Sequence, residues 1–256
     1  MIPENESKIV RFFREAGEMV FLFGRTVYWF RAISWNLRKI GHEMIMVGVQ
    51  SVFVVSVMAL FTGMVVALQS GYQLDQFQVK ELIGAIVGLS ILKEMGPVQT
   101  SLLVAARVGA GMTAEIGTMN VSEEVDALRS LAIDPVRYLV MPRFIACLIM
   151  LPMLTIYANS IGLLGGIFVA KHQLGVSVDT FINSMTDIIK LWDFFSGLIK
   201  TFFFGLIISI VGCYYGLQTY GGAEELGKAT TRTVVTCFMA ILISNYFLSR
   251  IFGWWG

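Results

Sequence analysis

Residues 44–69 read MIMVGVQSVFVVSVMALFTGMVVALQ and contain no charged side chain. A helix that crosses the hydrocarbon core of a bilayer needs about 20 predominantly apolar residues, and this stretch is longer than that. Over the whole chain 56% of the residues are hydrophobic and 14% are charged, whereas soluble domains have about 25% charged residues. The chain therefore lacks the polar surface of a soluble domain, and residues 44–69 are predicted to form its first membrane-spanning helix.

Four further apolar segments have the length of a membrane span. Two of them are longer than one straight span, and residues 82–117 contain the sequence Lys93-Glu94-Met95-Gly96-Pro97. Proline removes a backbone N–H and clashes with the preceding turn, so this helix is expected to break or kink there. The prediction is an all-α integral membrane protein with about five spans, which cover residues 44–69, 82–117, 138–170, 194–217 and 234–252.

Residues 8–40 follow a different pattern, because apolar side chains recur every three or four positions and basic side chains occupy the other side. A basic amphipathic helix lies in the membrane interface and attracts anionic headgroups, and the alternative is a soluble helix packed on a partner. We expect an interfacial helix within residues 1–43 and a transmembrane domain over residues 44–256. The apolar face consists of Ile9, Phe13, Ala16, Val20, Phe23, Val27, Phe30 and Leu37.

The distribution of lysine and arginine predicts the orientation of the chain. Most basic residues outside the spans fall on the side of the N-terminus, which the positive-inside rule places in the cytoplasm. The first residues, MIPENESK, are polar and lack the apolar core of a signal peptide. The net charge of +1 and the absence of a basic run give no indication of nucleic-acid binding. Cys147, Cys213 and Cys237 lie in apolar segments without metal-ligand spacing and are interpreted as packing residues.

The polar stretch GTMNVSEEVDALRSLAIDP, residues 117–135, connects two spans on the predicted cytoplasmic side. Asn120 is expected to cap a short helix there, with Glu123 as its capping-box partner. Acidic residues crowd the first turns, where the helix dipole favours negative charge. The apolar stripe of this helix either docks a partner protein or packs on the membrane domain itself, and consists of Val121, Val125, Leu128 and Ala132.

The run LKEMGPVQTSLLVAARVGAGMTAEIGTMNVSEEVDALRSLAIDPVRYLVMPR resembles the signature of the MlaE/YrbE family of lipid-transport ABC permeases. The elements E-x-G-P, A-x-R-V-G, A-E-I-G-T-M and E-x-V-D-A-L occur together and in order. The resemblance implies a permease homodimer in a bacterial inner membrane, bound to a cytoplasmic ABC ATPase dimer and to a periplasmic hexameric ring of MCE domains. It implies that phospholipid is the cargo, that outer-membrane lipid asymmetry is the purpose, and that ATP and Mg are used only by the ATPase.

The resemblance also assigns candidate residues to two sites. A coupling helix at about residues 120–133 would contact the ATPase through Val121, Glu123, Glu124, Asp126, Leu128 and Arg129. A lipid pocket at the outward mouth and a central cavity would be lined by Val66, Ser70, Gln73, Leu74, Phe77, Lys93, Glu94, Asp193 and Lys200.

The charged residues of the central cavity leave several interpretations open. Ionisable residues within spans are costly and usually face a cavity or a partner, and Lys200 is the expected partner of Glu94. A headgroup phosphate would prefer Lys93 or Lys200, whereas the alternative role is a structural ion pair that fixes a kinked helix. Asn245 replaces an acidic residue of many family members, which puts a charge network reaching the last span in doubt.

Other classes of protein fit the sequence less well. Residues 222–228 match GxxxxGK, but Ala229 replaces the Ser or Thr of a P-loop, so ATP is not expected to bind this chain. A membrane enzyme needs a nucleophile–base pair or a metal cluster, and no catalytic or metal site is predicted. A secondary transporter predicts internal repeats, and a scaffold does not need the charged break at Lys93-Glu94. Arg107 and Glu115 are interpreted as snorkelling residues or as a structural pair.

Overall fold

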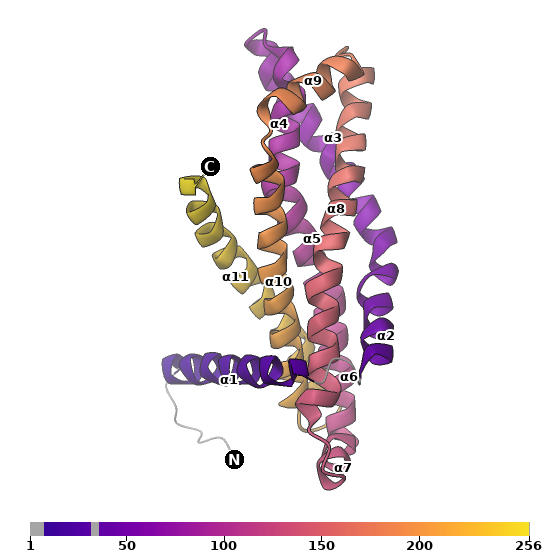
Figure 1. The fold of residues 1–256 in the computed structure, drawn as a ribbon, viewed down its shortest axis with the longest axis vertical. Helices are drawn as coiled ribbons and strands as arrows, with labels where there is room; N and C mark the ends of the chain where they lie inside the picture. Colours follow the sequence, from indigo (N-terminus) through magenta and orange to yellow (C-terminus); the bar gives the residue numbers. More distant parts are fainter. Residues whose placement is uncertain (1–7, 32–35, 256) are drawn as a thin grey trace.

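The computed structural model describes residues 8–31 and 36–255, and throughout these residues the regular structure is helical (Figure 1). Four helical segments within the described part of the chain are long and apolar enough to cross a membrane. The first combines α2 (Leu37–Val47), a 3-10 turn (Val49–Ser51) and α3 (Val52–Gln76). The other three are η6 (Val136–Val140) with α8 (Met141–His172), α10 (Leu191–Leu217) and α11 (Ala223–Trp255).

The remaining predicted span, residues 82–117, is helical but divided into five pieces. It begins after a 3-10 turn (Lys80–Leu82) and runs along the bundle from α4 to α6 (Figure 1). The predicted interruption at residues 93–97 is confirmed in position, but it is a π-turn rather than a break, and Pro97 occupies the first turn of α5, where its missing N–H is harmless. The pieces are α4 (Ile83–Ser90), η4 (Ile91–Met95), α5 (Gly96–Val104), η5 (Ala105–Gly109) and α6 (Ala110–Val121), of which η4 and η5 are π-turns.

The N-terminal helix is shorter than the periodicity indicates. The helix α1 (Lys8–Tyr28) crosses the direction of the bundle (Figure 1), and a 3-10 turn follows it at residues 29–31. A single helix over residues 8–40 is therefore wrong, because α2 already begins the first span at Leu37. The boundary predicted at residue 43 falls inside α2, and residues 1–7 and 32–35 of the predicted interfacial segment lie outside the described residues.

Small residues allow the helices of the bundle to approach closely. On α3, the buried Ala59, Gly63, Ala67 and Gly71 recur every four residues and face α8. A Cβ atom added to Gly63 would collide with the carbonyl of Gly162, so only glycine permits this crossing. These small residues therefore let α3 and α8 pack closely.

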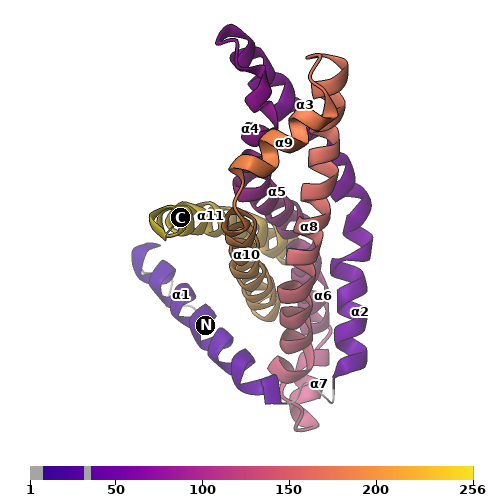
Figure 2. The same ribbon diagram turned by 45° about the horizontal axis from the view of Figure 1, so that its top comes forward.

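The two ends of the bundle carry short helices. The helix α9 (Val178–Ile188) packs on α4, and Ser177 caps it by accepting a hydrogen bond from the Thr180 N–H. The helix α7 (Glu124–Ser130) lies at the opposite end, which is also the end at which α1 crosses the bundle (Figures 1 and 2). These placements separate the loop of residues 122–135 from the C-terminal end of α3 by the length of the bundle.

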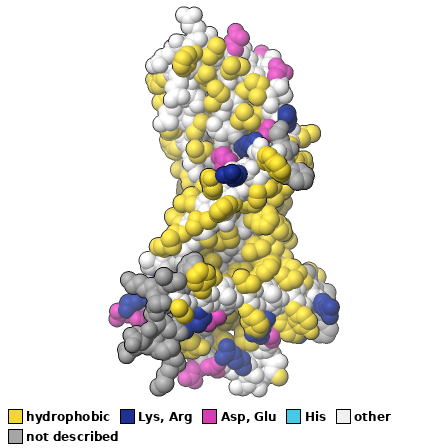
Figure 3. Space-filling view, turned by 90° about the vertical axis from the view of Figure 1, so that its left-hand side faces the viewer, with side chains coloured by type: hydrophobic (Ala, Val, Ile, Leu, Met, Phe, Trp, Pro, Cys, Tyr) yellow, Lys and Arg dark blue, Asp and Glu magenta, His cyan; other side chains and the backbone are white. Residues whose placement is uncertain are grey.

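The outer surface matches a lipid environment. Figure 3 shows a broad hydrophobic zone across the middle of one face, with most of the charged side chains below it. The helix α11 leans away from the bundle (Figure 1) and exposes large apolar side chains along most of its length, among them Met239, Ile243 and Phe247. The chain is therefore a multi-pass membrane protein, in agreement with the predicted fold class.

Candidate functional site

An ion pair joins Lys93 in the π-turn η4 to Asp193 in the first turn of α10. Their Nζ and Oδ1 atoms lie 2.8 Å apart, and 11% of the aspartate side chain is exposed. Asp193 also accepts a hydrogen bond from the Lys190 backbone N–H through Oδ2. One carboxylate therefore caps the start of α10 and holds the π-turn against it.

A second ion pair involves Glu94, the next residue of the π-turn η4. The Lys200 Nζ is 2.7 Å from the Glu94 Oε1, and the lysine side chain is 1% exposed. The same ammonium donates to the Lys93 carbonyl at 3.0 Å and to the Ser249 hydroxyl at 2.8 Å, so all three of its N–H donors are used. The expected partnership of Lys200 with Glu94 is confirmed.

The network continues into α11 through neutral side chains. Asn245 donates to the second Glu94 oxygen at 3.1 Å, and Ser249 donates to the first at 2.9 Å. The network therefore does reach the last span. The amide of Asn245 and the hydroxyl of Ser249 make the connection to Glu94, although position 245 lacks the acidic residue of many family members. Two cations and two anions balance in this network, which consists of Lys93, Glu94, Asp193, Lys200, Asn245 and Ser249.

The local sequence explains how α10 reaches the π-turn. A Cβ atom on Gly197 would collide with the Leu92 carbonyl, so the backbones of α10 and η4 touch only because residue 197 is glycine. The π-turn inserts an extra residue in the ring of hydrogen bonds, and the carbonyl of Lys93 accepts from a side chain of another helix. The geometry ties three helices together at one polar point within an apolar bundle.

The loop helix departs from its prediction. The helix α7 has seven residues, and Glu123 precedes it with φ 59° and no capping side chain. The predicted Asn120 cap is wrong, because Asn120 is buried at the end of α6 and donates to the carbonyls of Leu217 and Thr219. Of the apolar stripe, Val125 is buried against the membrane domain and Leu128 is half-buried, while Val121 and Ala132 are exposed.

Comparisons of the sequence identify related proteins. The family model "Permease MlaE" matches residues 40–251. The chain belongs to the MlaE permease family. A probable ABC transporter permease protein of Synechocystis sp. is 40% identical over 214 residues, which cover 84% of this chain and 81% of that protein. The intermembrane phospholipid transport system permease protein MlaE of Haemophilus influenzae is 34% identical over 245 residues, covering 95% and 94%. The chloroplastic protein TRIGALACTOSYLDIACYLGLYCEROL 1 of Arabidopsis thaliana is 34% identical over 205 residues, covering 80% and 59%.

The prediction that this MlaE permease is a transporter subunit rather than an enzyme is confirmed by these relatives. The near-match to a P-loop at residues 222–228 lies at the start of α11, and residues 223–229 are helical. A P-loop cradles phosphate with the backbone N–H groups of a loop, which a helix does not present.

The residues predicted to line an outward pocket lie along the C-terminal half of α3 and just beyond it. Val66, Ser70 and Gln73 are partly or fully exposed, and Phe77 just beyond the helix is 74% exposed. Leu74 instead packs in the buried cluster that contains Ile83, so its assignment to an open lipid pocket is not favoured by the structure. Among the described contacts, no hydrogen bond or ion pair joins these residues to the charge network.

Sequence reasoning missed the pairing of Arg143, the most buried arginine among the described side chains. Arg143 is 6% exposed, and its Nη2 lies 2.8 Å from the Glu115 Oε2, while its Nε lies 3.4 Å from the Glu43 Oε1. Glu115 therefore pairs with Arg143 and not with Arg107, which donates to Ser51 and Gln50 instead. The position of Arg143 inside an apolar segment was the signal that could have identified it.

Proposed function

We propose that this chain is the membrane subunit of an ABC transporter that moves phospholipids between the inner membrane and a periplasmic MCE-domain partner. The Haemophilus relative, which is aligned over 95% of this chain, is named as a permease of intermembrane phospholipid transport. Transport between two membranes by this chain would maintain the lipid asymmetry of the outer membrane. The apolar surface and the helical bundle are those expected of such a permease.

The charge network is the observation that supports transport most strongly. A structural bundle in lipid gains little from two ion pairs, because ionisable groups within spans are costly and are retained where they line a pathway or a moving joint. Here they connect a π-turn to α10 and α11, and α11 is otherwise little buried. We infer that the network holds α11 against the bundle and releases it when the transporter opens.

Lys93 is the better candidate for contact with a lipid phosphate. The three donors of Lys200 are already used within the network. Lys93 is 34% exposed and makes its ion pair with a single carboxylate, so it retains donors for a headgroup. Acyl chains would lie near the half-buried Val66 and the exposed Phe77 at the outward end of α3.

The loop helix α7 would couple this movement to ATP hydrolysis. Glu123 just before α7 is exposed, as are Glu124, Asp126 and Arg129 on it, and Asp126 and Arg129 form an ion pair of 2.8 Å. We infer a homodimer of this chain that binds two ATPase subunits through α7 and a hexameric MCE ring at the other end. ATP and Mg would bind to the ATPase, and the N-terminus would lie in the cytoplasm.

Native mass spectrometry and reconstitution test this function together. Purification in mild detergent should yield two copies of this chain with two ATPase chains and bound phospholipid. Proteoliposomes that contain the complex should transfer a fluorescent phospholipid to or from the MCE partner only when ATP is present. A monomer without ATPase, or transfer that is independent of ATP, would refute the proposal.

A further inference from the structure

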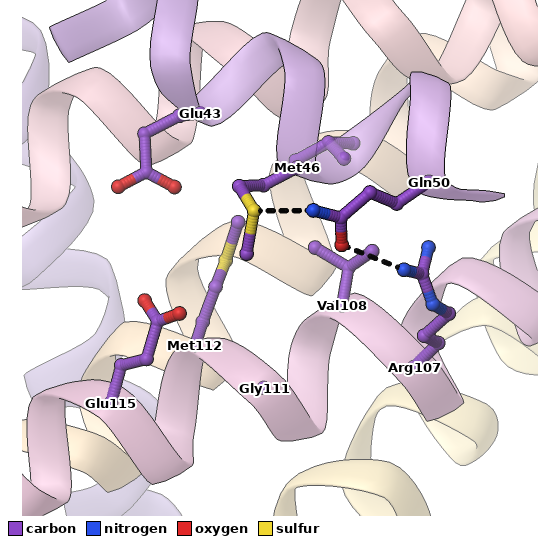
Figure 4. Close-up of a pocket in the computed structure, with 9 residues that line it drawn as sticks. Glu43, Met46, Gln50, Arg107, Val108, Gly111, Met112 and Glu115 are labelled. Atoms are coloured by element: carbon purple, nitrogen blue, oxygen red, sulfur yellow. Dashed lines mark hydrogen bonds between the residues drawn. The ribbon is translucent and has the colours of Figure 1, made fainter.

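A small pocket of about 120 Å³ opens between α2 and α6, near the end of the bundle at which α1 crosses it (Figures 1 and 4). Figure 4 shows the carboxylates of Glu43 and Glu115 facing the same gap from the two helices, with Arg107 on its other side. The walls between them are formed by Met46 and Met112. The pocket is therefore acidic at one end, basic at the other and apolar between.

The acidic end has a carboxylate that is open to a ligand. Glu43 and Glu115 share one cation, Arg143, whose side chain is 8% exposed, while the Glu115 side chain is 49% exposed. Lys39, one turn before Glu43 on α2, has its ammonium over the ring of Tyr138. Lys39 also interacts electrostatically with Glu43, so the open feature of this end is Glu115. Its Oε2 accepts from Arg143, which leaves Oε1 to accept a hydrogen bond from a primary ammonium.

The basic end has unused donors. Arg107 donates from Nη1 to the Ser51 hydroxyl at 2.7 Å and from Nη2 to the Gln50 amide oxygen at 2.9 Å. Within the described part of the chain these bonds use two of its five N–H donors. Arg107 is exposed, so its remaining donors are accessible to a ligand, and a guanidinium can bind two oxygens of a phosphate.

The separation of the two ends suits a headgroup that carries both charges. Arg107 in the π-turn η5 and Glu115 in α6 lie eight residues apart along two helical pieces that follow each other directly, which is about 12 Å at 1.5 Å per residue. A phosphate bound at Arg107 and an ammonium bound at Glu43 and Glu115 fit between these limits. A purely anionic headgroup would bring no cation to the carboxylates of Glu43 and Glu115.

The surface beside the pocket indicates that the ligand is a lipid. Beyond Gln50, exposed apolar side chains continue along the same face of α3 at helical spacing: Phe53 is 76% exposed, Val57 44% and Phe61 59%. A lipid whose headgroup occupies the pocket would lay its acyl chains along this face. The amphipathic helix α1 crosses the bundle at the same end, which is the depth at which headgroups lie.

We propose that the pocket between α2 and α6 binds the headgroup of a zwitterionic phospholipid with a primary amine, of the phosphatidylethanolamine type. Arg107 holds the phosphate, and Glu43 and Glu115 hold the ammonium. This site is separate from the charge network and from the outward end of α3, and it binds lipid whether or not that lipid is cargo. It lies in the cytoplasmic leaflet in the orientation of the proposed function.

The purified complex in mild detergent should be titrated with dioleoyl phosphatidylethanolamine and with dioleoyl phosphatidylglycerol, with bound lipid counted by native mass spectrometry. Wild-type protein should prefer the zwitterionic lipid. Arg107→Gln should weaken binding of both lipids by about tenfold, which is the usual loss when a hydrogen bond to a charged group is removed. Glu115→Gln should weaken only phosphatidylethanolamine, because phosphatidylglycerol has no ammonium.

Two matched variants control for general effects of charge. Arg250→Gln removes an exposed cation from the C-terminal part of α11, and Glu225→Gln removes an exposed acid near its start, so neither should change the ratio of the two lipids. Thermal unfolding identifies any variant that loses its fold, and Arg107→Gln remains informative if Glu115→Gln destabilises Arg143. Unchanged phosphatidylethanolamine binding in Arg107→Gln, or an equal loss of both lipids in Glu115→Gln, would overturn the site even if ATP-driven transport is observed.

Discussion

The Nζ of Lys200 on α10 lies 2.7 Å from the Oε1 of Glu94 in the π-turn η4, and the two side chains differ greatly in exposure, at 1% and 39%. The pair is therefore asymmetric. Loss of the carboxylate leaves a buried cation without its counter-ion, whereas loss of both charges leaves nothing to neutralise. This asymmetry makes stability and transport separable by mutation.

Glu94→Gln should lower the free energy of unfolding by about 3 kcal/mol, the lower end of the range for breaking a buried ion pair, because Glu94 is partly exposed. The double variant Glu94→Gln/Lys200→Met should recover most of that loss, since a methionine fills the site of the lysine without a charge. Both variants should lose ATP-dependent lipid transfer. Unfolding in detergent and transfer in proteoliposomes provide the two measurements.

The exposed Glu81→Gln, outside the network, serves as the control and should leave both quantities unchanged. If the double variant were as unstable as the single one, the stability argument would be wrong. Full transport by the double variant would show that the charges serve only to hold the helices together.

Two hydrogen bonds attach α11 to the charge network. Asn245→Leu and Ser249→Ala remove the two hydrogen bonds to Glu94, each worth about 1.5–3 kcal/mol because the acceptor is charged. In the combined variant α11 should spend more time away from α10. Spin-label distances between the two helices should become longer and broader than in wild-type protein.

Leu242→Ala is the matched control for α11, because Leu242 is 53% exposed on the same helix and lies apart from the network. It should leave the distance distribution unchanged. An unchanged distribution in Asn245→Leu/Ser249→Ala would mean that apolar packing alone holds α11.

The spans could be predicted from sequence because the requirement for apolar length acts locally along the chain. Residues 44–69 and 194–217 reappear within α2–α3 and α10 for that reason. An interruption near residues 93–97 could be predicted from sequence, but not that it is a π-turn at residues 91–95. Its form depends on Gly197 and Lys200 of another helix, which are far away in sequence.

The errors at the N-terminus and in the loop have a similar cause. Periodicity continues across residues 29–36, but Arg25 and Trp29 bind Asp134, and the helix ends there. Asn120 has the sequence context of a cap, yet its amide bonds the end of α10. In both places a long-range polar contact overrides a local preference, and one sequence does not reveal such contacts.

The exposed apolar residue Leu131, just after α7, provides a test of ATPase docking. It is 71% exposed, whereas Val125 is fully buried and Leu128 is half-buried. Leu131→Asp should reduce ATPase binding at least about tenfold, because an interface hot spot contributes roughly 2 kcal/mol or more, and should leave the membrane domain folded. Leu128→Asp should reduce ATPase binding in the same way, with some loss of stability. Co-purification with the ATPase measures the binding of both variants.

Val125→Asp is the contrasting variant, because it places a charge in the contact between α7 and α6 and should destabilise the loop itself. Wild-type ATPase binding by Leu131→Asp and Leu128→Asp would exclude α7 as the docking element.

The attachment of α1 to the bundle should depend on pH through Asp134. Burial alone would raise the pKa of this carboxyl, but hydrogen bonds from the Val136 N–H and from the side chains of Arg25 and Trp29 outweigh it and lower the pKa. A lowered pKa means that the ionised form stabilises the fold. The contribution is fully present above the unfolded value of about 3.9 and is lost as the pH falls through the lower folded value.

Asp134→Asn removes this contribution while keeping an oxygen that can accept from Val136. At pH 6 the variant should be less stable than wild-type protein by about 1 kcal/mol, a modest amount because the Arg25 side chain is 45% exposed. The difference should shrink as the pH falls below about 3.9, where the unfolded chain takes up a proton first. It should approach zero once the pH also falls below the lower pKa of folded Asp134. Thermal unfolding of both proteins in detergent between pH 3 and 6 measures it, with Asp75→Asn as a control from the other end of the bundle. A constant difference at every pH would show that Asp134 acts only as a hydrogen-bond acceptor, because a charge-dependent contact must weaken when the charge is lost.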